Sequence, residues 1–299
     1  MTALPPIVDR ETWEEGIEQL RVREKAHTRE GDAIAAARRR LAMVEVDAAV
    51  PLVGPAGEVP LIDTFEGRTQ LFASYMMWYD GAPAARQCEG CTKDNAQVRE
   101  LSYLHSRDVT FAVFCQGPFA ESDRYRAFMG WEAPFYSVPE TSRDVLIAGR
   151  HFGMNVCYLR DGVRVFETYW TTGRGNETMG AAYAMLDQTV YGRQEAWEDS
   201  PVGWPQIYPG TASEQMRTDE HGRSVGRPGG RPIPQWPRLA AGHSDDLGGG
   251  HTPRSGCAGP PPSVQRASRP CRRRCSGAAI SRRSAGSAPS TSPTPATPR

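Results

Sequence analysis

The chain opens on a pattern of apolar and polar positions typical of an amphipathic helix. Thr12 followed by Glu15 has the spacing of a capping box, which predicts that a helix starts there. The next apolar residues recur at intervals of three and four and so share one helical face. They are Trp13, Ile17 and Leu20. An Ala- and Arg-rich stretch extends the helix to about Leu41, with a break expected at Gly31.

Two continuous apolar runs further along predict strands covered on both faces, Leu71–Trp78 and Val109–Cys115. Between them, apolar residues at helical spacing predict a helix over Thr92–Arg107. A second helix is expected over Ser122–Met129, ending at Gly130, and a loop region over Phe135–Gly149.

Paired strands are expected on either side of this unit. Asp161-Gly162, flanked by alternating segments over Asn155–Arg160 and Val163–Trp170, is a strong hairpin signal. A shorter strand over Met43–Val46 and a hairpin over Val50–Leu61 precede the first buried run, and Asn176 is placed to cap a last helix. The order of strand, helix, strand, helix, hairpin and helix predicts an α/β fold of three layers, with a central mixed sheet flanked by helices.

Composition divides the 299 residues. From residue 252 onward there are nine Arg and no Asp or Glu, which leaves 26 basic and 35 acidic residues in the rest. A tail so poor in large apolar residues cannot offset its ordering entropy, so we expect it to be disordered. Its composition is also that of a GC-rich sequence translated out of frame. The expected divisions are an N-terminal helical extension (1–42), an α/β domain (43–206), a Gly/Pro/Arg-rich extension (207–250) and the basic tail (251–299).

The compartment follows from what the sequence lacks. The first residues carry neither a basic nor an apolar leader region, and no run approaches the roughly 18 apolar residues of a membrane span. We therefore expect a cytoplasmic protein with no membrane partner. Seven cysteines at irregular spacings fit reduced thiols better than a disulfide framework.

The chemistry most strongly suggested by the sequence is that of Cys88 and Cys91, which form the motif CEGC where a loop meets a predicted helix. The unpaired N–H groups of a helix start favour a thiolate. Cys88, expected at the exposed end, would attack a disulfide or peroxide, and Cys91, expected to be more buried, would resolve the mixed disulfide. Glu89 raises the pKa of the neighbouring thiol, whereas Arg86 and Lys93 could offset it.

The pair has two other interpretations. It could be structural, or it could be half of a metal site, which needs two further ligands. The candidates for those ligands are Cys115, Cys157, His105 and His151, although both cysteines lie in apolar strands typical of core residues.

Several segments together resemble one family. They are EKAHTREGDAIAAARRR, QCEGCTKDN, LSYLHSRDVTFAVFCQGP, FMGWEAPFYS, RDGVRVFETYWTTGRG and YGRQEAWEDSPVGWPQ. In this order, from about residue 10 to about residue 206, they resemble the bacterial thioredoxin-like proteins grouped as domain of unknown function 899. The resemblance implies a thioredoxin-like fold related to the peroxiredoxin branch. It brings no function, since fold and activity are separate inferences.

The same resemblance draws attention to a missing residue. Thioredoxins carry a cis-proline that faces the cysteine pair, and the matching stretch before Asn155, His151–Met154, contains no proline. Between that hairpin and the last helix, Gly173 and Gly175 predict a tight turn, with Arg174 as a weaker candidate for anion binding.

Three functions are therefore open, the third being an enzyme in which the sheet edge and the loop before Cys88 bind a small molecule. The first is a thiol–disulfide oxidoreductase or thiol peroxidase-like protein that uses Cys88 and Cys91 with a disulfide or peroxide substrate and a thiol reductant, without a cofactor and without nucleic acid. The second is a non-catalytic binding protein on a thioredoxin scaffold, whose cysteines are structural or bind metal.

Overall fold

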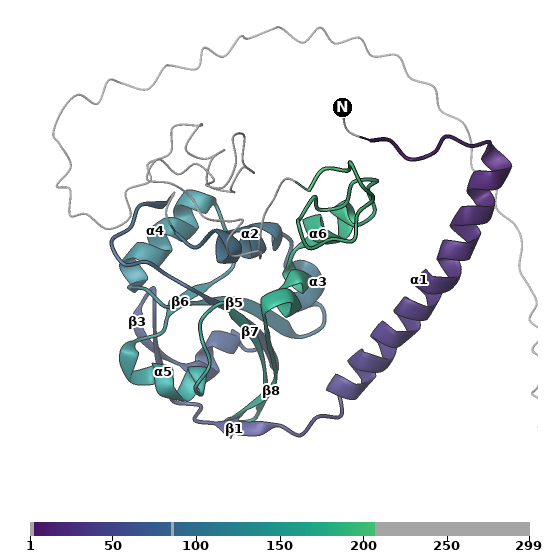
Figure 1. Ribbon diagram of the computed structural model, residues 1–299. Coiled ribbons are helices and arrows are strands. Elements are labelled where there is room, and N and C mark those ends of the chain that lie inside the picture. The colour runs from purple at the N-terminus through teal and green to yellow at the C-terminus, as the bar shows by residue number, and fades with distance from the viewer. Residues whose placement is uncertain (1–2, 85–86, 207–299) are drawn as a thin grey trace, which may run out of the picture. The chain divides into compact units, whose positions relative to one another are not determined.

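The computed structural model describes residues 3–84 and 87–206 of the chain (Figure 1). The helices, in chain order, are α1 (Arg10–Arg38), the 3-10 helix η1 (Leu61–Phe65), α2 (Glu89–Gln97), α3 (Ser102–His105), α4 (Phe119–Met129), α5 (Glu140–Ile147), the 3-10 helix η3 (Gly173–Met179) and α6 (Ala181–Leu186). The strands are β1 (Val44–Val46), β2 (Pro51–Gly54), β3 (Gly57–Pro60), β4 (Gln70–Met76), β5 (Val109–Cys115), β6 (Phe135–Ser137), β7 (Met154–Asp161) and β8 (Arg164–Thr172).

The strands form one mixed sheet in the order β1-β8-β7-β4-β5-β6-β2-β3. β4, β5 and β6 run parallel, and the other neighbours pair antiparallel. β4 pairs along most of its length with both β5 and β7, so it lies at the centre of the sheet. The predicted α/β fold is confirmed. A central strand followed by the CEGC helix, a parallel strand, a helix and an antiparallel hairpin is the thioredoxin-like arrangement.

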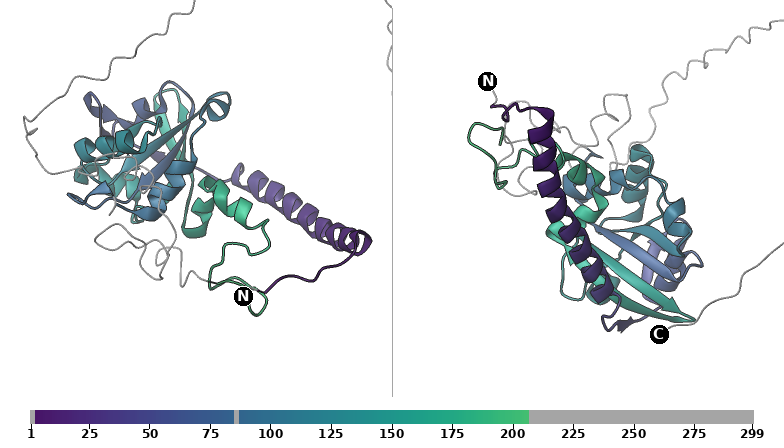
Figure 2. Two further views of the ribbon diagram at one scale, coloured as in Figure 1. Left: turned by 90° about the horizontal axis from the view of Figure 1, so that it is seen from above. Right: turned by 90° about the vertical axis from the view of Figure 1, so that its right-hand side faces the viewer.

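The alternation of side chains along the strands divides the core in two. In β4, Leu71, Ala73 and Tyr75 lie in one buried cluster, which η1 and α5 cover. Residues of the opposite strand face, among them Met76, lie in a second cluster with residues of α2 and α4. The sheet therefore lies between two layers, as the views in Figure 2 show, and the thiol pair belongs to the second cluster.

Most predicted strands are confirmed. β5 has the expected bounds, and the Asp161-Gly162 turn joins β7 and β8, with Gly162 at a φ of 60°. α1 differs in its start and its continuity. Its N-cap is Asp9, whose carboxylate accepts a hydrogen bond from the Thr12 N–H at 2.8 Å, so Thr12 lies inside the helix. The helix also continues through Gly31 without a break.

The single helix expected over Thr92–Arg107 was wrong. α2 starts at Glu89 and ends at Gln97, and α3 follows after a non-helical stretch. Val98, Leu101 and Leu104 nevertheless pack against the second cluster. The helical spacing reflected burial on one face and not a continuous helix.

Two other expectations also need correction. The stretch expected as a loop over 135–149 contains the buried strand β6 and helix α5, which begins directly after Pro139. Proline fixes φ and suits a helix start, so Pro139 with Glu140 was a helix signal that the pattern of apolar residues concealed. Asn176 does not cap the last helix, because it lies inside η3 and donates from Nδ2 to the Gly153 carbonyl at 2.7 Å.

The expected extension over 207–250 and the expected disordered tail over 251–299 lie outside the described residues. Among the residues that the structure describes, no helix combines the length and the apolar character that a membrane span requires.

Candidate functional site

The two cysteines lie at the first turn of α2. Cys88 is the N-cap residue, and its Sγ accepts from the Cys91 N–H at 3.5 Å. The Sγ atoms of the two free thiols are 3.3 Å apart. A disulfide bond is about 2.05 Å long, so the pair can close by a movement of roughly 1.3 Å. The spacing of the motif is therefore sufficient for a reversible disulfide.

The protein shifts the pKa values of the two thiols in opposite directions. The pKa of Cys88 is lowered, first by its hydrogen bond with Cys91 and then by backbone N–H groups of the helix start, against the opposing effect of burial. The pKa of Cys91 is raised well above its ordinary value, because that same hydrogen bond favours its protonated form and because it is buried. Cys88 therefore has the lower pKa of the two thiols.

The expected difference in exposure was wrong. Cys88 is 7% exposed and Cys91 is 8% exposed, so neither thiol lies at the surface. Both belong to the second core cluster, together with Trp78, Ala84 and Met179. Hydrogen bonding therefore distinguishes the two thiols.

The central strand positions Cys91. The Met77 N–H, directly after β4, donates to its Sγ at 3.4 Å. The next residue of α2, Thr92, shares a 2.7 Å hydrogen bond with the Tyr125 hydroxyl, which fixes α2 on α4. Both contacts join segments far apart in the sequence, so the motif alone could not show them.

A tryptophan lies in the same core cluster as the pair. Trp78 is 4% exposed, and its Nε1 donates to Glu121 Oε2 on α4 at 3.0 Å. Tyr125 packs edge-on against it, with ring centroids 5.4 Å apart. Gly117 makes room for the indole, because a Cβ there would lie 1.9 Å from Trp78 Cδ1.

The loop that leads to Cys88 is organised by Gln87, which is 1% exposed. Its Nε2 donates to the carbonyls of Tyr79 and Ala82, each at 2.9 Å, and its Oε1 accepts from the Tyr79 N–H at 3.1 Å. Sequence reasoning missed this residue. Its position next to Cys88 was the only available signal.

One carboxylate acts on both thiols. Asp94, one turn after Cys91, raises the pKa of Cys91 and of Cys88 through its charge. Burial raises the pKa of Asp94 itself, although Lys93 Nζ lies 2.9 Å from its Oδ1. Lys93 also lies 3.4 Å above the Tyr183 ring, so its charge is directed to Asp94 and Tyr183. The predicted effects of Glu89, Arg86 and Lys93 on the pKa of the neighbouring thiol stay a prediction, because Arg86 and the Glu89 side chain are not among the described parts of the structure.

Gly153 lies directly before β7, in the stretch where the sequence lacks the proline expected of a thioredoxin. Its φ is +87°, which favours glycine, and Met77 lies 3.4 Å from the position of a Cβ. Its N–H donates to the Tyr75 carbonyl at 2.7 Å. Its carbonyl accepts from Thr172 Oγ1 at 2.9 Å and from Asn176 Nδ2 at 2.7 Å. Both the N–H and the carbonyl of Gly153 are thus hydrogen-bonded within the protein.

The structure does not gather the other metal-ligand candidates. Within residues 3–84 and 87–206 there is no group of three or more His, Cys, Asp or Glu that could hold a metal ion. Burial raises the pKa of Cys115 to about 12 and that of Cys157 to about 11. Cys115 is a core residue, as expected, whereas Cys157 is only half-buried.

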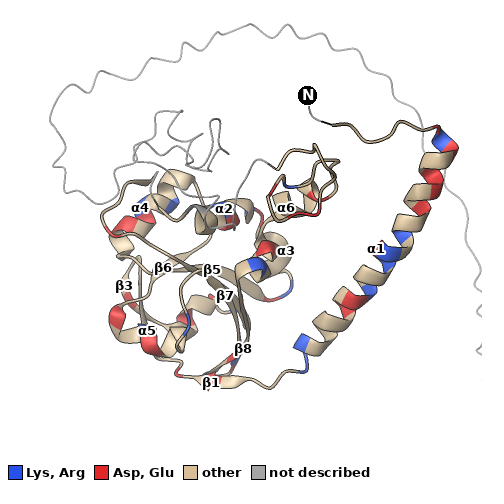
Figure 3. Ribbon diagram, in the orientation of Figure 1, with Lys and Arg blue, Asp and Glu red and all other residues tan. Residues whose placement is uncertain are grey.

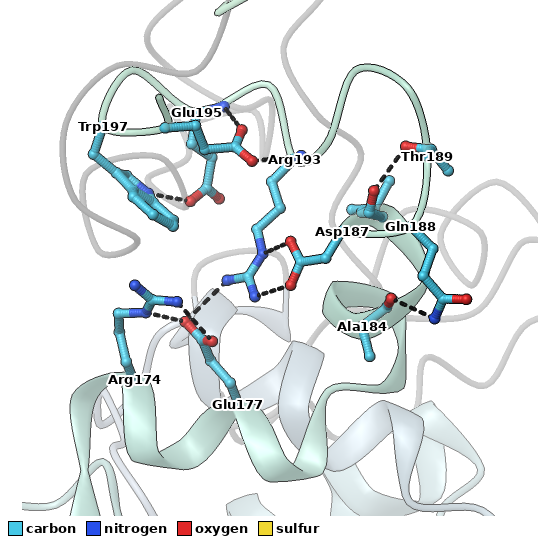
Figure 4. A network of polar contacts seen from close by, with 11 residues as sticks. Arg174, Glu177, Ala184, Asp187, Gln188, Thr189, Arg193, Glu195 and Trp197 are labelled. Atoms are coloured by element: carbon cyan, nitrogen blue, oxygen red, sulfur yellow. Dashed lines mark hydrogen bonds and ion pairs between the residues drawn. The ribbon is translucent and has the colours of Figure 1, made fainter. Parts of the chain in front are cut away.

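The segment after β8 is held by a buried arginine that sequence reasoning missed (Figure 4). The Arg193 side chain is 6% exposed and forms ion pairs with Asp187 at 2.6 Å and Glu177 at 3.0 Å. It also lies 4.3 Å from the Tyr183 ring centroid. Arg174, the candidate for anion binding, instead pairs with Glu177 at 2.9 Å, and Gly173 adopts a φ of +57°. The turn interpretation of this segment therefore fits, and Arg174 is already engaged.

A model of the family described as "Bacterial protein of unknown function (DUF899)" matches residues 2–219. The chain belongs to this family. Among curated proteins, none matches.

The chain also has a distant likeness among solved structures. A crystal structure described as a putative thiol:disulfide interchange protein DsbE from Chlorobium tepidum is 14% identical, with a TM-score of 0.31, over 48% of this chain and 98% of that one. At this level of similarity the comparison adds no argument about the site, which rests on its own geometry.

Proposed function

We propose that the protein is a thiol–disulfide oxidoreductase that cycles Cys88 and Cys91 between dithiol and disulfide. The observation that carries the proposal is the 3.3 Å separation of the two Sγ atoms at a helix N-terminus, with the pKa of Cys88 lowered and that of Cys91 raised. The thiolate is the nucleophile in such exchange, and the second thiol must stay available until the mixed disulfide has formed.

With a disulfide substrate, the Cys88 thiolate attacks one substrate sulfur and the other leaves as a thiolate, which takes up a proton from solvent. Cys91 then loses its proton and attacks Cys88 Sγ, which releases the second substrate thiolate. The substrate gains two electrons and the pair becomes a disulfide. An external thiol reductant returns it to the dithiol.

With a peroxide substrate, Cys88 attacks one peroxide oxygen, and the O–O bond breaks to release an alcohol or water after protonation. The resulting sulfenic acid condenses with the Cys91 thiol, with loss of water, to the same disulfide. Both reactions use the same two sulfur atoms and need no further cofactor.

The test compares three variants of the full chain with oxidised glutathione or hydrogen peroxide as substrate and dithiothreitol as reductant. Cys88→Ser should abolish turnover. Without dithiothreitol, Cys91→Ser should accumulate with oxidised glutathione an adduct on Cys88 that intact mass detects. Cys115→Ser is the matched control, because this buried thiol has a pKa of about 12 and lies on β5. If Cys88→Ser retained the wild-type rate with both substrates, the proposal would be wrong.

The burial of both thiols favours one alternative, a non-catalytic scaffold in which the cysteines serve the core. That alternative expects free thiols under mild oxidation, whereas the oxidoreductase expects a reversible disulfide. The reduction potential of the couple distinguishes the two, since a value outside the cellular range excludes redox cycling.

A further inference from the structure

A cavity lies in the segment that follows α6. Its volume is about 310 Å³, which is within the range of small-molecule sites in proteins. Residues from two stretches, 189–192 and 197–204, line it. None of the described residues that line it belongs to the core cluster that contains the two thiols. The proposed oxidoreductase activity therefore leaves this cavity without a role.

Two aromatic rings form a corner of the cavity. The ring centroids of Tyr191 and Trp204 are 5.4 Å apart, and the ring planes meet at 83°. The Tyr191 hydroxyl donates to the Ala3 carbonyl at 3.1 Å. The Trp204 N–H donates to the Pro201 carbonyl at 3.1 Å. Because hydrogen bonds within the protein hold both residues, the corner is formed before any ligand binds.

A third ring of the lining already contacts a cation. Trp197 is 49% exposed, and the guanidinium carbon of Arg174 lies 4.5 Å from its ring centroid. Arg174 is not among the described residues that line the cavity. The faces of aromatic rings attract positive charge, and tryptophan does so most strongly. The aromatic part of the lining therefore favours a cationic ligand.

The charged side chains of the described lining are both acidic, Glu198 and Asp199. The two carboxylate oxygens of Glu198 accept from the Arg193 N–H at 3.1 Å and from the Glu195 N–H at 2.8 Å. The Arg193 guanidinium is paired with two other carboxylates, as Figure 4 shows, so it does not neutralise this lining. Residues 187–206 carry four acidic residues and one basic residue, and Figure 3 shows acidic positions around α6.

We propose that this cavity binds a small organic cation of the quaternary ammonium class. The aromatic corner receives the methylated nitrogen, and the carboxylates of Glu198 and Asp199 supply the opposite charge. A quaternary nitrogen has no N–H, so it needs no hydrogen-bond acceptor. This suits the lining, because both oxygens of Glu198 already accept backbone N–H groups.

The test is isothermal titration calorimetry of the full chain with choline chloride and with 3,3-dimethyl-1-butanol, which has the shape of choline without its charge. Choline should bind at least about tenfold more tightly than the neutral alcohol. Trp204→Leu should weaken choline binding by about tenfold, and Asp199→Asn by about threefold, because Asp199 is exposed. The comparison of the two ligands uses the wild type alone, so it decides the question even where Trp204→Leu disturbs the fold of the segment.

Two matched control variants change residues outside the cavity. Trp170 on β8 is 43% exposed and, like Trp197, contacts an arginine, so Trp170→Leu should leave the affinity for choline unchanged. Asp161→Asn, at the end of β7, should also leave it unchanged. Equal binding of choline and the neutral alcohol would overturn the proposal, as would the absence of choline binding at about 10 mM. So would equal weakening by Trp204→Leu and Trp170→Leu, since the effect would then not come from the cavity.

Discussion

A methyl group at Gly117 should disturb the core cluster that contains the two thiols. The Cβ of Gly117→Ala would lie 1.9 Å from Trp78 Cδ1 and 2.3 Å from Cγ, and an atom pair cannot remain so close. Gly117 is not in the left-handed backbone region, so the cost is steric. The indole must shift, although it is buried and bonded to Glu121.

The magnitude follows from two effects. Overpacking a well-packed core costs about 1–3 kcal/mol. Loss of the 3.0 Å bond between Trp78 Nε1 and Glu121 adds about 1 kcal/mol. We therefore expect Gly117→Ala to lower the free energy of unfolding by roughly 2–4 kcal/mol. Because Trp78 shares its cluster with both cysteines, the rate of thiol alkylation should change as well.

The assay is urea unfolding of the full chain, followed by far-ultraviolet circular dichroism. Gly31→Ala is the matched control, because a Cβ there meets nothing within 4 Å and alanine favours a helix. In a Trp78→Ala background, Gly117→Ala should cost less than about 0.5 kcal/mol, since the clash is gone. An equal cost with and without the indole would refute this account.

Three further outcomes are expected. The rate of Cys88 alkylation by iodoacetamide should rise with pH around a midpoint below 9.0, because the pKa of this thiol is lowered; a midpoint above 9.0 would contradict the assignment. Asp94→Asn should move that midpoint lower still, since the carboxylate charge raises the pKa of Cys88. Because the pKa of Asp94 is raised in the folded state, the folded protein loses stability as the pH rises above 3.8. Asp94→Asn should therefore be more stable than the wild type near pH 7, and this gain should fade towards pH 4. Arg193→Gln should lower the free energy of unfolding by roughly 2 kcal/mol and speed hydrogen exchange over residues 181–206. The same change at Arg174, whose side chain is 67% exposed, should cost less than about 0.5 kcal/mol. Equal costs would contradict the assignment of Arg193 as the residue that holds this segment.

The sequence predicted those parts of the fold that depend on local patterns. The continuous apolar run of β5 and the Asp161-Gly162 turn are local signals, and both segments form as expected. The start of α1 was misplaced because Asp9 competes with Thr12 for the cap, and both side chains suit that position. Strand β6 was missed because three residues are too few to show a period.

The candidate site was located from its motif, but its surroundings were not. Cys88 and Cys91 are three residues apart, so the helix brings them together. Glu121 lies 43 residues from Trp78 along the chain, and only the folded sheet brings these two together. The equal burial of the two thiols likewise depends on layers contributed by distant segments, which no spacing within the motif records.

The ends of the sheet bear on how molecules of this protein avoid each other. β3 is an edge strand of four residues and ends at Pro60, which has no N–H to offer a new strand. β1, at the other end, has only three residues. Short and proline-bearing edges resist the strand addition that leads to aggregates. The protein should therefore not aggregate through its sheet edges in concentrated solution, and turbidity at high concentration would measure this.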